Sequence, residues 1–133
     1  MIVFDTSACI EFLRGQSKTK LLVDFVERSG DAVAMTTVSL FELLSPIEHR
    51  KLRNEEKAVK AFVRGTILLE LDLASAAEAS RIMGALLRLG IPINPLDTLI
   101  SGIAVAKGAE KIVTADHDFE QVEKVADIEV QMI

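Results

Sequence analysis

Several residue types that mark particular protein classes are scarce in this sequence. Cys9 is the one cysteine among 133 residues, so no intramolecular disulfide is possible. No apolar run approaches the roughly 20 residues that span a bilayer, and nothing resembles a signal peptide. We therefore expect a cytoplasmic protein. Because Cys9 stands between Ala8 and Ile10 on an expected helix, we place it in the core rather than in a reactive site.

Tryptophan and tyrosine are missing altogether, and acidic residues outnumber lysine and arginine. The net charge of -5 argues against a protein that coats nucleic acid over its whole surface, although it leaves room for one local basic groove. Stacking on nucleobases would fall to the six phenylalanines, most of which look like core residues. Recognition of any nucleic acid would therefore depend mainly on phosphate contacts and on shape.

Half of the residues are apolar, which is enough for a sizeable core. We find no repeat, low-complexity tract or linker, and we expect one domain over residues 1–133. Short strands that alternate with helices imply parallel pairing through right-handed crossovers. The predicted fold is an α/β protein, a three-layer α/β/α sandwich with a central, mainly parallel five-stranded sheet. The strands are expected at Ile2–Phe4, Ala32–Met35, Ile67–Leu71, Lys111–Thr114 and Ile128–Met132.

Glycine, proline and capping residues divide the intervening stretches into helices. One helix carries Glu42 and is expected to kink or end at Pro46, because proline supplies no backbone donor and disfavours helical geometry at Ser45. Another, from Asp97 to about Lys107, is almost wholly apolar and must be buried. The remaining helices are expected at about 6–14, 17–29, 54–64 and 74–89.

Four acidic residues fall where a strand-like run ends or a helix begins. Asp5 and Asp116 follow strands, while Glu42 and Asp97 lie in the first turns of helices. Because the carboxyl ends of parallel strands share one crevice, all four can converge there. Taken singly, each of these acids could be a helix cap, and Glu42 could lie on an exposed helix face. Only their joint placement favours a shared site.

Carboxylates that gather within a few ångströms raise one another's pKa and need nearby positive charge. Oxygen ligands without a cysteine or histidine framework favour Mg²⁺ or Mn²⁺ over Zn²⁺. Such ions turn bound water into a nucleophile and offset the charge of an attacked phosphate. The four acids therefore predict a metal-dependent enzyme that hydrolyses phosphate esters.

The ordered motifs around these acids resemble those of PIN-domain proteins, most closely the VapC-type toxin ribonucleases of prokaryotic toxin-antitoxin pairs. They are the segments Ile2–Ser7, Thr37–Leu43, Pro95–Asp97 and Ile112–Phe119, and the resemblance runs nearly end to end. It implies metal-dependent hydrolysis of RNA phosphodiesters, a homodimer and a neutralising antitoxin.

By the same resemblance, the catalytic and metal-binding set is Asp5, Glu42, Asp97 and Asp116. Ser7 and Thr114 would orient ligands or water. Many relatives carry asparagine at the position of Asp116, and Asp118 lies two residues farther on, so either acid could be the fourth. We favour Asp116, because it follows the strand more closely, and expect Asp118 in a turn or cap.

Basic residues that could hold RNA phosphates gather in two helical regions, although such runs are usually solvated faces. We expect RNA contacts from Arg14, Arg50, Lys51 and Arg53. Other cations of the same regions are Lys18, Lys20, Lys57, Lys60 and Arg64.

Other functions fit the sequence less well. A haloacid-dehalogenase-like enzyme would need an acid where Ser7 stands, and a receiver domain would need an acidic pair before its phosphoacceptor. A metal-free ribonuclease would need His49 and His117 at one site, whereas His117 is expected to be an exposed turn residue. Two alternatives remain, an RNA-processing PIN nuclease without an antitoxin and a catalytically silent PIN-fold interaction module. The silent module would be expected to lack one of the four acids.

Overall fold

A central parallel sheet organises the computed structural model, which describes residues 1–133. Its five strands run in the order β3-β2-β1-β4-β5, and every neighbouring pair is parallel. This confirms the predicted fold class. Strand bounds differ from the prediction by two residues at most. The strands are β1 (Ile2–Phe4), β2 (Val33–Thr36), β3 (Ile67–Leu69), β4 (Lys111–Thr114) and β5 (Glu129–Met132).

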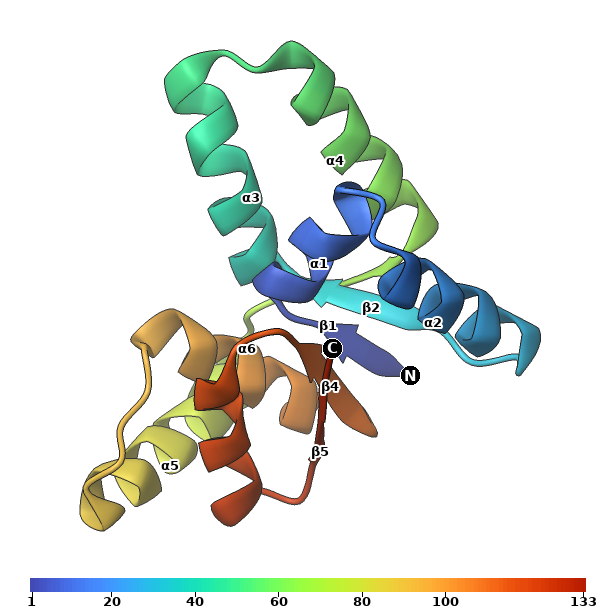
Figure 1. Cartoon of the computed structure of the whole chain (residues 1–133). Helices are drawn as coiled ribbons and strands as arrows, with labels where there is room; N and C mark the ends of the chain where they lie inside the picture. Colours follow the sequence, from blue (N-terminus) through green and yellow to red (C-terminus); the bar gives the residue numbers. More distant parts are fainter.

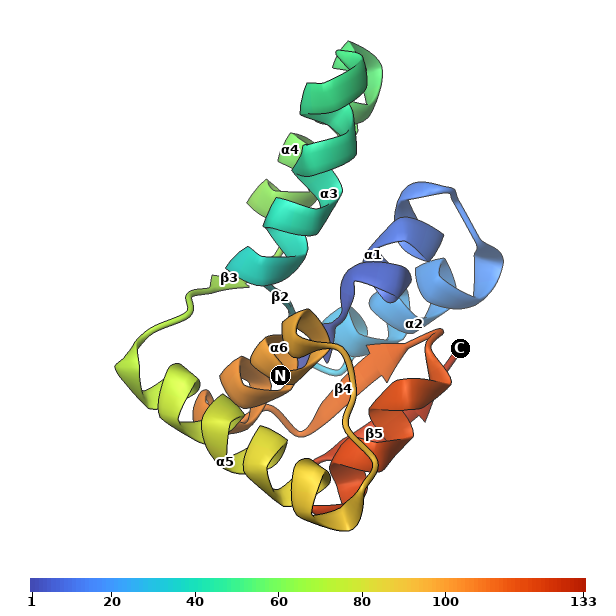
Figure 2. The ribbon, with the colours of Figure 1, turned by 90° about the vertical axis from the view of Figure 1, so that its left-hand side faces the viewer.

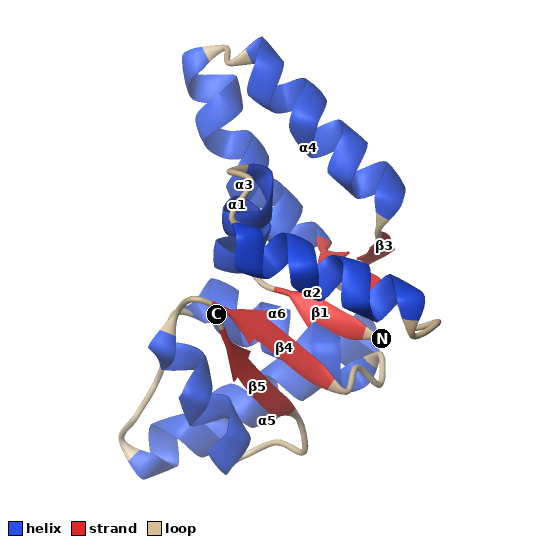
Figure 3. Ribbon diagram, turned by 45° about the vertical axis from the view of Figure 1, so that its right-hand side comes forward, coloured by secondary structure: helices blue, strands red, loops and turns tan.

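Helices cover both faces of this sheet (Figure 3). Helices α1 to α4 lie on one side, and α5, α6 and the 3₁₀ helix η1 lie on the other (Figure 1). None of them combines the length and hydrophobicity needed to cross a membrane. Their bounds are α1 (Thr6–Leu13), α2 (Ser17–Arg28), α3 (Thr37–Arg50), α4 (Arg53–Gly65), α5 (Leu73–Leu89), α6 (Pro95–Ala106) and η1 (His117–Lys124).

The core is split into two clusters because strand side chains alternate between the faces of the sheet. In β1, Ile2 and Phe4 pack beneath α1 to α4, whereas Val3 packs beneath α5 and α6. Cys9 is fully buried in the first cluster, as expected for a core residue. Burial raises the pKa of its thiol, so Cys9 is not a reactive group.

Helix α3 continues through Pro46 to Arg50, so of the two outcomes expected at the proline, a kink or an end, the end is wrong. Proline removes only one backbone hydrogen bond, and the buried side chains of Leu43 and Ile47 anchor the helix on either side of it. Nearby, the Ser45 hydroxyl donates to the carbonyl oxygen of Phe41 at 2.6 Å. Packing therefore outweighs the local preference to stop.

The expected turn after Asp116 is instead the start of η1. Phe119 and Val122, three residues apart, are both fully buried. Three residues complete one turn of a 3₁₀ helix, so this spacing places both side chains on the core. The spacing was visible in the sequence, but a single pair of apolar residues is too short a pattern to separate a helix from a turn.

Candidate acidic metal site

Asp5 lies at the carboxyl end of β1 and is held by a dense set of donors. Its carboxylate caps α1 by accepting from the Ala8 backbone N–H at 2.8 Å. The Ser7 hydroxyl donates at 2.8 Å to one oxygen, and the Thr114 hydroxyl donates at 2.8 Å to the other. Burial is the largest influence on the pKa of Asp5 and raises it, while these hydrogen bonds act in the opposite direction.

Ser7 and Thr114 also join β1 to β4 across the site. Their hydroxyl oxygens lie 3.2 Å apart. The Ser7 oxygen accepts from the Ala115 backbone N–H, and the Thr114 oxygen accepts from the Asp116 backbone N–H at 2.9 Å. The two hydroxyls therefore position both the Asp5 carboxylate and the backbone that carries Asp116.

Glu42 reaches the same edge of the sheet from the second turn of α3, one turn later than expected. The Thr6 hydroxyl donates to its carboxylate at 2.6 Å, so the side chain is directed at α1 rather than into solvent. Thr6 was not among the site residues expected from the sequence. Its position between Asp5 and Ser7 was visible in the sequence, but its partner lies 36 residues away and only the fold brings the two together.

Asp97 occupies the third position of α6, behind the Asn94 cap and Pro95. Its pKa is raised to about 7, chiefly by burial. Nearby carboxylates add to the shift through their negative charge; in decreasing order they are Asp116, Glu42, Asp5 and Asp118. Asp97 thus lies within electrostatic reach of every acid that the sequence placed at this edge.

Asp116 follows β4 and caps η1, because its carboxylate accepts from the Asp118 backbone N–H at 2.9 Å. It is partly buried, whereas Asp118 is exposed in the first turn of the same helix. The cap is therefore Asp116, not Asp118. Asp116 also has the larger electrostatic effect on Asp97.

The cluster formed by Asp5, Glu42, Asp97 and Asp116 has no cation of its own. None of its members takes part in any of the protein's ion pairs. No three acidic, histidine or cysteine side chains lie close enough to enclose an ion by themselves. Oxygen donors that are arranged loosely suit Mg²⁺ or Mn²⁺, because these ions usually keep water and take further ligands from substrate phosphates.

The basic residues proposed for RNA contact do not surround this cluster. Arg14 is exposed at the end of α1, and Arg50, Lys51 and Arg53 lie at the turn between α3 and α4. That turn projects beyond the sheet (Figure 2). His117 is exposed over 81% of its side chain and contacts Glu120, which agrees with the expected exposed histidine. It begins η1 rather than lying in a turn.

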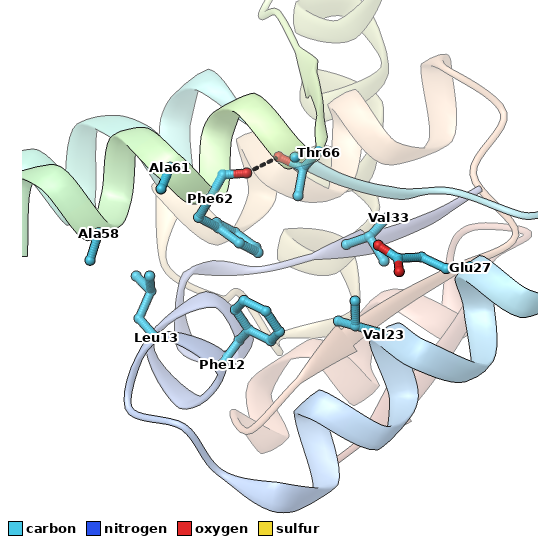
Figure 4. A pocket seen from close by; sticks show the side chains of 10 residues that line it. Phe12, Leu13, Val23, Glu27, Val33, Ala58, Ala61, Phe62 and Thr66 are labelled. Atoms are coloured by element: carbon cyan, nitrogen blue, oxygen red, sulfur yellow. Dashed lines mark hydrogen bonds between the residues drawn. The ribbon is translucent and has the colours of Figure 1, made fainter.

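An apolar groove opens on the side of the sheet that α1 to α4 cover. It has a volume of about 420 Å³ and lies between α1, α2 and α4 (Figure 4). The rings of Phe12 and Phe62 meet there with their centroids 5.0 Å apart. Val23 and the exposed Ala58 and Ala61 lie along the rest of its wall, so the groove presents apolar surface to solvent.

The sequence and the fold are similar to those of known proteins. The family model described as the PIN domain matches residues 2–125. A protein named tRNA(fMet)-specific endonuclease VapC, from Shigella flexneri, is 26% identical over 121 residues, which are 90% of each chain. A namesake from Salmonella typhimurium is 23% identical over the same share.

Solved structures similar in fold include VapBC2 from Rickettsia felis, bound to a DNA fragment from its promoter. The TM-score is 0.88 at 15% identity, over 100% of this chain and 99% of that one. VapBC-5 of Mycobacterium tuberculosis, a member of the VapBC family of toxin-antitoxin systems, has a TM-score of 0.76 at 24% identity and 98% and 97% coverage.

Proposed function

This chain belongs to the PIN-domain family, and on that premise we propose that it is a metal-dependent endoribonuclease, the toxin of a toxin-antitoxin pair. The observation that carries the proposal is the crowding of uncompensated carboxylates around Asp97. The two curated relatives bear the name of a tRNA endonuclease and support RNA as the substrate class. The whole chain, residues 1–133, would act as one cytoplasmic nuclease domain.

We assign metal binding to Asp5, Glu42, Asp97 and Asp116, with Mg²⁺ or Mn²⁺ as the ion. The preference for these ions rests on the oxygen-only donor set. Bound divalent ions supply activated water and charge that offsets the attacked phosphate and the leaving oxygen. Burial and the neighbouring carboxylates raise the pKa of Asp97, and a bound cation would compensate the negative charge that the protein's own side chains leave unpaired.

The protein's own side chains prepare the site before RNA arrives. Ser7 and Thr114 hold the Asp5 carboxylate in one orientation, and Thr6 holds Glu42. A preorganised set of carboxylates need not rearrange during the reaction, so the ligand geometry is available as soon as substrate binds. Asp116 is tied to the same network through its backbone N–H.

The antitoxin would bind in the apolar groove beside Phe12 and Phe62. The solved relatives include toxin-antitoxin complexes, and an amphipathic helix that buries its apolar face matches a groove with these walls. A homodimer is also expected. It is supported by large apolar side chains left in solvent on α5, among them Leu73, exposed over 87% of its surface, and Leu87. Light scattering that finds only a 14.5 kDa species would contradict dimerisation.

The nuclease proposal is tested with purified protein and total RNA, with Mn²⁺ or Mg²⁺ and with EDTA. Cleavage should require the metal. Asp97→Asn should lower the rate about 10³-fold, a loss of roughly 4 kcal/mol of transition-state stabilisation. Asp127→Asn, at an exposed acid outside the cluster, is the matched control and should cleave normally. Undiminished cleavage by folded Asp97→Asn protein would rule out the assigned site.

A further inference from the structure

Helices α3 and α4 extend away from the sheet and meet at a short turn around Lys51 and Leu52 (Figure 1). A cavity of about 390 Å³ lies between them near this turn, and we name it the tip pocket. Its charged lining residues are Glu48, Lys51, Arg53, Glu56, Lys57 and Lys60. Neither the carboxylate cluster nor the apolar groove includes any of these residues.

The tip pocket has more positive than negative charge. Lys51 pairs with Glu48 at 3.4 Å and Lys60 with Glu56 at 2.9 Å, while Arg53 and Lys57 form no ion pair. Between residues 48 and 60 five lysine or arginine residues face three glutamates, a net charge of +2 in a chain whose total is -5. The surrounding segment is thus locally cationic on an acidic protein.

The shifted pKa of Glu56 agrees with the excess of positive charge in the tip pocket. The pKa of Glu56 is lowered, first by its hydrogen bond with Lys60 and further by the positive charges of Lys60, Arg53 and Lys51. Cations from the end of α3 and from the first two turns of α4 therefore converge on one carboxylate. Arg53 acts on this carboxylate without forming an ion pair with it, and Lys57 forms no ion pair at all.

At the turn between α3 and α4, a lysine occupies the left-handed position that glycine usually takes after a helix. Lys51 ends α3 in the left-handed conformation, with φ of 53°, and is the one non-glycine residue with positive φ. Helix α4 then begins at Leu52 without a side-chain cap, so no side chain of this chain occupies its first N–H groups.

The distance between the carboxylate cluster and the tip pocket determines how long an RNA strand must be to contact both. Nine residues separate Glu42 from Lys51, which corresponds to about 13 Å along α3 and to its opposite side. A strand that passes around a helix about 10 Å wide covers roughly 16 Å around it and about 13 Å along it. This path of about 21 Å corresponds to about six nucleotides of a stacked strand at about 3.4 Å each. Only longer RNA could occupy both places at once.

We propose that the tip pocket binds backbone phosphates of the RNA substrate distant from the scissile bond, about six nucleotides away along a stacked strand. The proposal rests on the ribonuclease function proposed above and adds a second point of contact to it. Phosphate oxygens are the ligands that unpaired arginine and lysine side chains hold best, and such contacts carry no sequence information.

Binding is measured in EDTA, where no cleavage occurs, by the fluorescence anisotropy of a labelled 20-nucleotide RNA at increasing KCl. The variant carries Arg53→Gln and Lys57→Gln. Because each phosphate contact contributes about -0.7 to the slope of log affinity against log salt, its slope should be shallower by roughly 1.4. The matched control carries Arg28→Gln and Arg88→Gln, at exposed ends of α2 and α5, and should keep the original slope.

Cleavage in Mn²⁺ gives a second readout. For the 20-nucleotide RNA, the double variant should show a KM raised about tenfold with kcat unchanged. A four-nucleotide RNA cut at its centre cannot reach the tip pocket, so both proteins should cleave it equally. This split separates a contact with distant phosphates from general damage to the fold.

Either unchanged salt dependence in the double variant or failure of the unaltered protein to bind RNA in EDTA would overturn the proposal. A variant that binds RNA normally but escapes inhibition by the antitoxin would identify the pocket as a protein-docking site and also overturn it. The nuclease function fails separately, if unaltered protein binds RNA but never cuts it with metal present.

Discussion

The two faces of the sheet are covered in different ways. On one face α5 and α6 approach so closely that a Cβ added to Gly102 would lie 2.5 Å from the backbone nitrogen of Ala79. On the other face α1, α2 and α4 leave the apolar groove open beside Phe12 and Phe62. The first face, here called the closed face, is tightly packed where α5 meets α6, although Leu73 and Leu87 leave apolar surface on α5. The second, here called the open face, has an apolar groove between its helices.

The carboxylate cluster lies at the boundary between the two faces. Asp5 and Glu42 belong to α1 and α3 on the open face, whereas Asp97 and Asp116 belong to α6 and η1 on the closed face. Helices α3 and α6 contact each other there. Because the four acids come from both sides of the sheet, the proposed site depends on the two layers of helices keeping their relative position.

The largest effect on folding is expected where the closed face is tightest. Gly102→Ala would place its new Cβ against the Ala79 backbone, which cannot move aside easily, and should lower the free energy of unfolding by about 3 kcal/mol in urea titrations. Gly84→Ala, in α5, meets only the tip of the Arg88 side chain at 3.5 Å. It should be neutral or stabilising by up to about 1 kcal/mol. Equal effects would show that the two helices can separate freely.

At the boundary, Thr114→Val removes the hydroxyl that donates to Asp5 and accepts from the Asp116 backbone N–H. Loss of such an orienting group should reduce cleavage 10- to 100-fold, or roughly 2 kcal/mol. Thr19→Val is the control, because Thr19 is also buried and hydrogen-bonded, but to Gln16 at the start of α2. If both variants cleave alike, the Thr114 hydroxyl does not position Asp5.

The pH dependence of stability tests the charge at the same boundary. The pKa of Asp97 rises from 3.8 to about 7 on folding, so the unfolded chain loses this proton first. Stability of the metal-free protein should therefore fall as pH rises from about 4 to 7 and stay low above that. After a discount for partial exposure, Asp97 contributes about 2 kcal/mol of this loss.

Urea titrations in EDTA check this expectation. Asp97→Asn should be more stable than the unaltered protein at pH 8 but not at pH 4, because asparagine carries no charge at either pH. An equal difference at both pH values would contradict a repulsive origin. Addition of Mn²⁺ at pH 8 should stabilise the unaltered protein more than the variant.

The smallest effect on stability is expected in the open groove. Ala58→Asp should lower the free energy of unfolding by no more than about 1 kcal/mol, because Ala58 is exposed in α4. Inhibition by the antitoxin should nevertheless weaken, since a charge in the groove must be desolvated on binding. Ala77→Asp, exposed in α5, carries the same change away from the groove and should leave inhibition intact. Unchanged inhibition in both variants would show that the antitoxin does not bind in the apolar groove.

Much of the fold could be predicted because strong local patterns agree with the tertiary structure. The runs at Ile2–Phe4 and Lys111–Thr114 form the strands expected of them. Gly90 follows α5 in the left-handed conformation, directly after the expected end of that helix at residue 89. Pro46 and the segment after Asp116 were predicted less well, since packing of distant side chains overrides weak local preferences there.

Only part of the candidate site could be predicted from the sequence. Acidic side chains at the ends of strands and the starts of helices indicated one edge, because parallel topology directs those ends the same way. The bond between Thr6 and Glu42 and the pKa of Asp97 had no local signal. Both depend on distances between residues that are far apart along the chain.

The amino-acid sequence alone determined the parallel sheet, its two layers of helices and the identity of the acids at its edge, because alternation of apolar residues and the placement of caps act over a few positions. Only the tertiary structure decided which hydroxyl holds which carboxylate, which face of the sheet stays open and where the cations gather. Those outcomes depend on how helices pack against one another, and packing is settled by contacts between segments that local patterns do not connect.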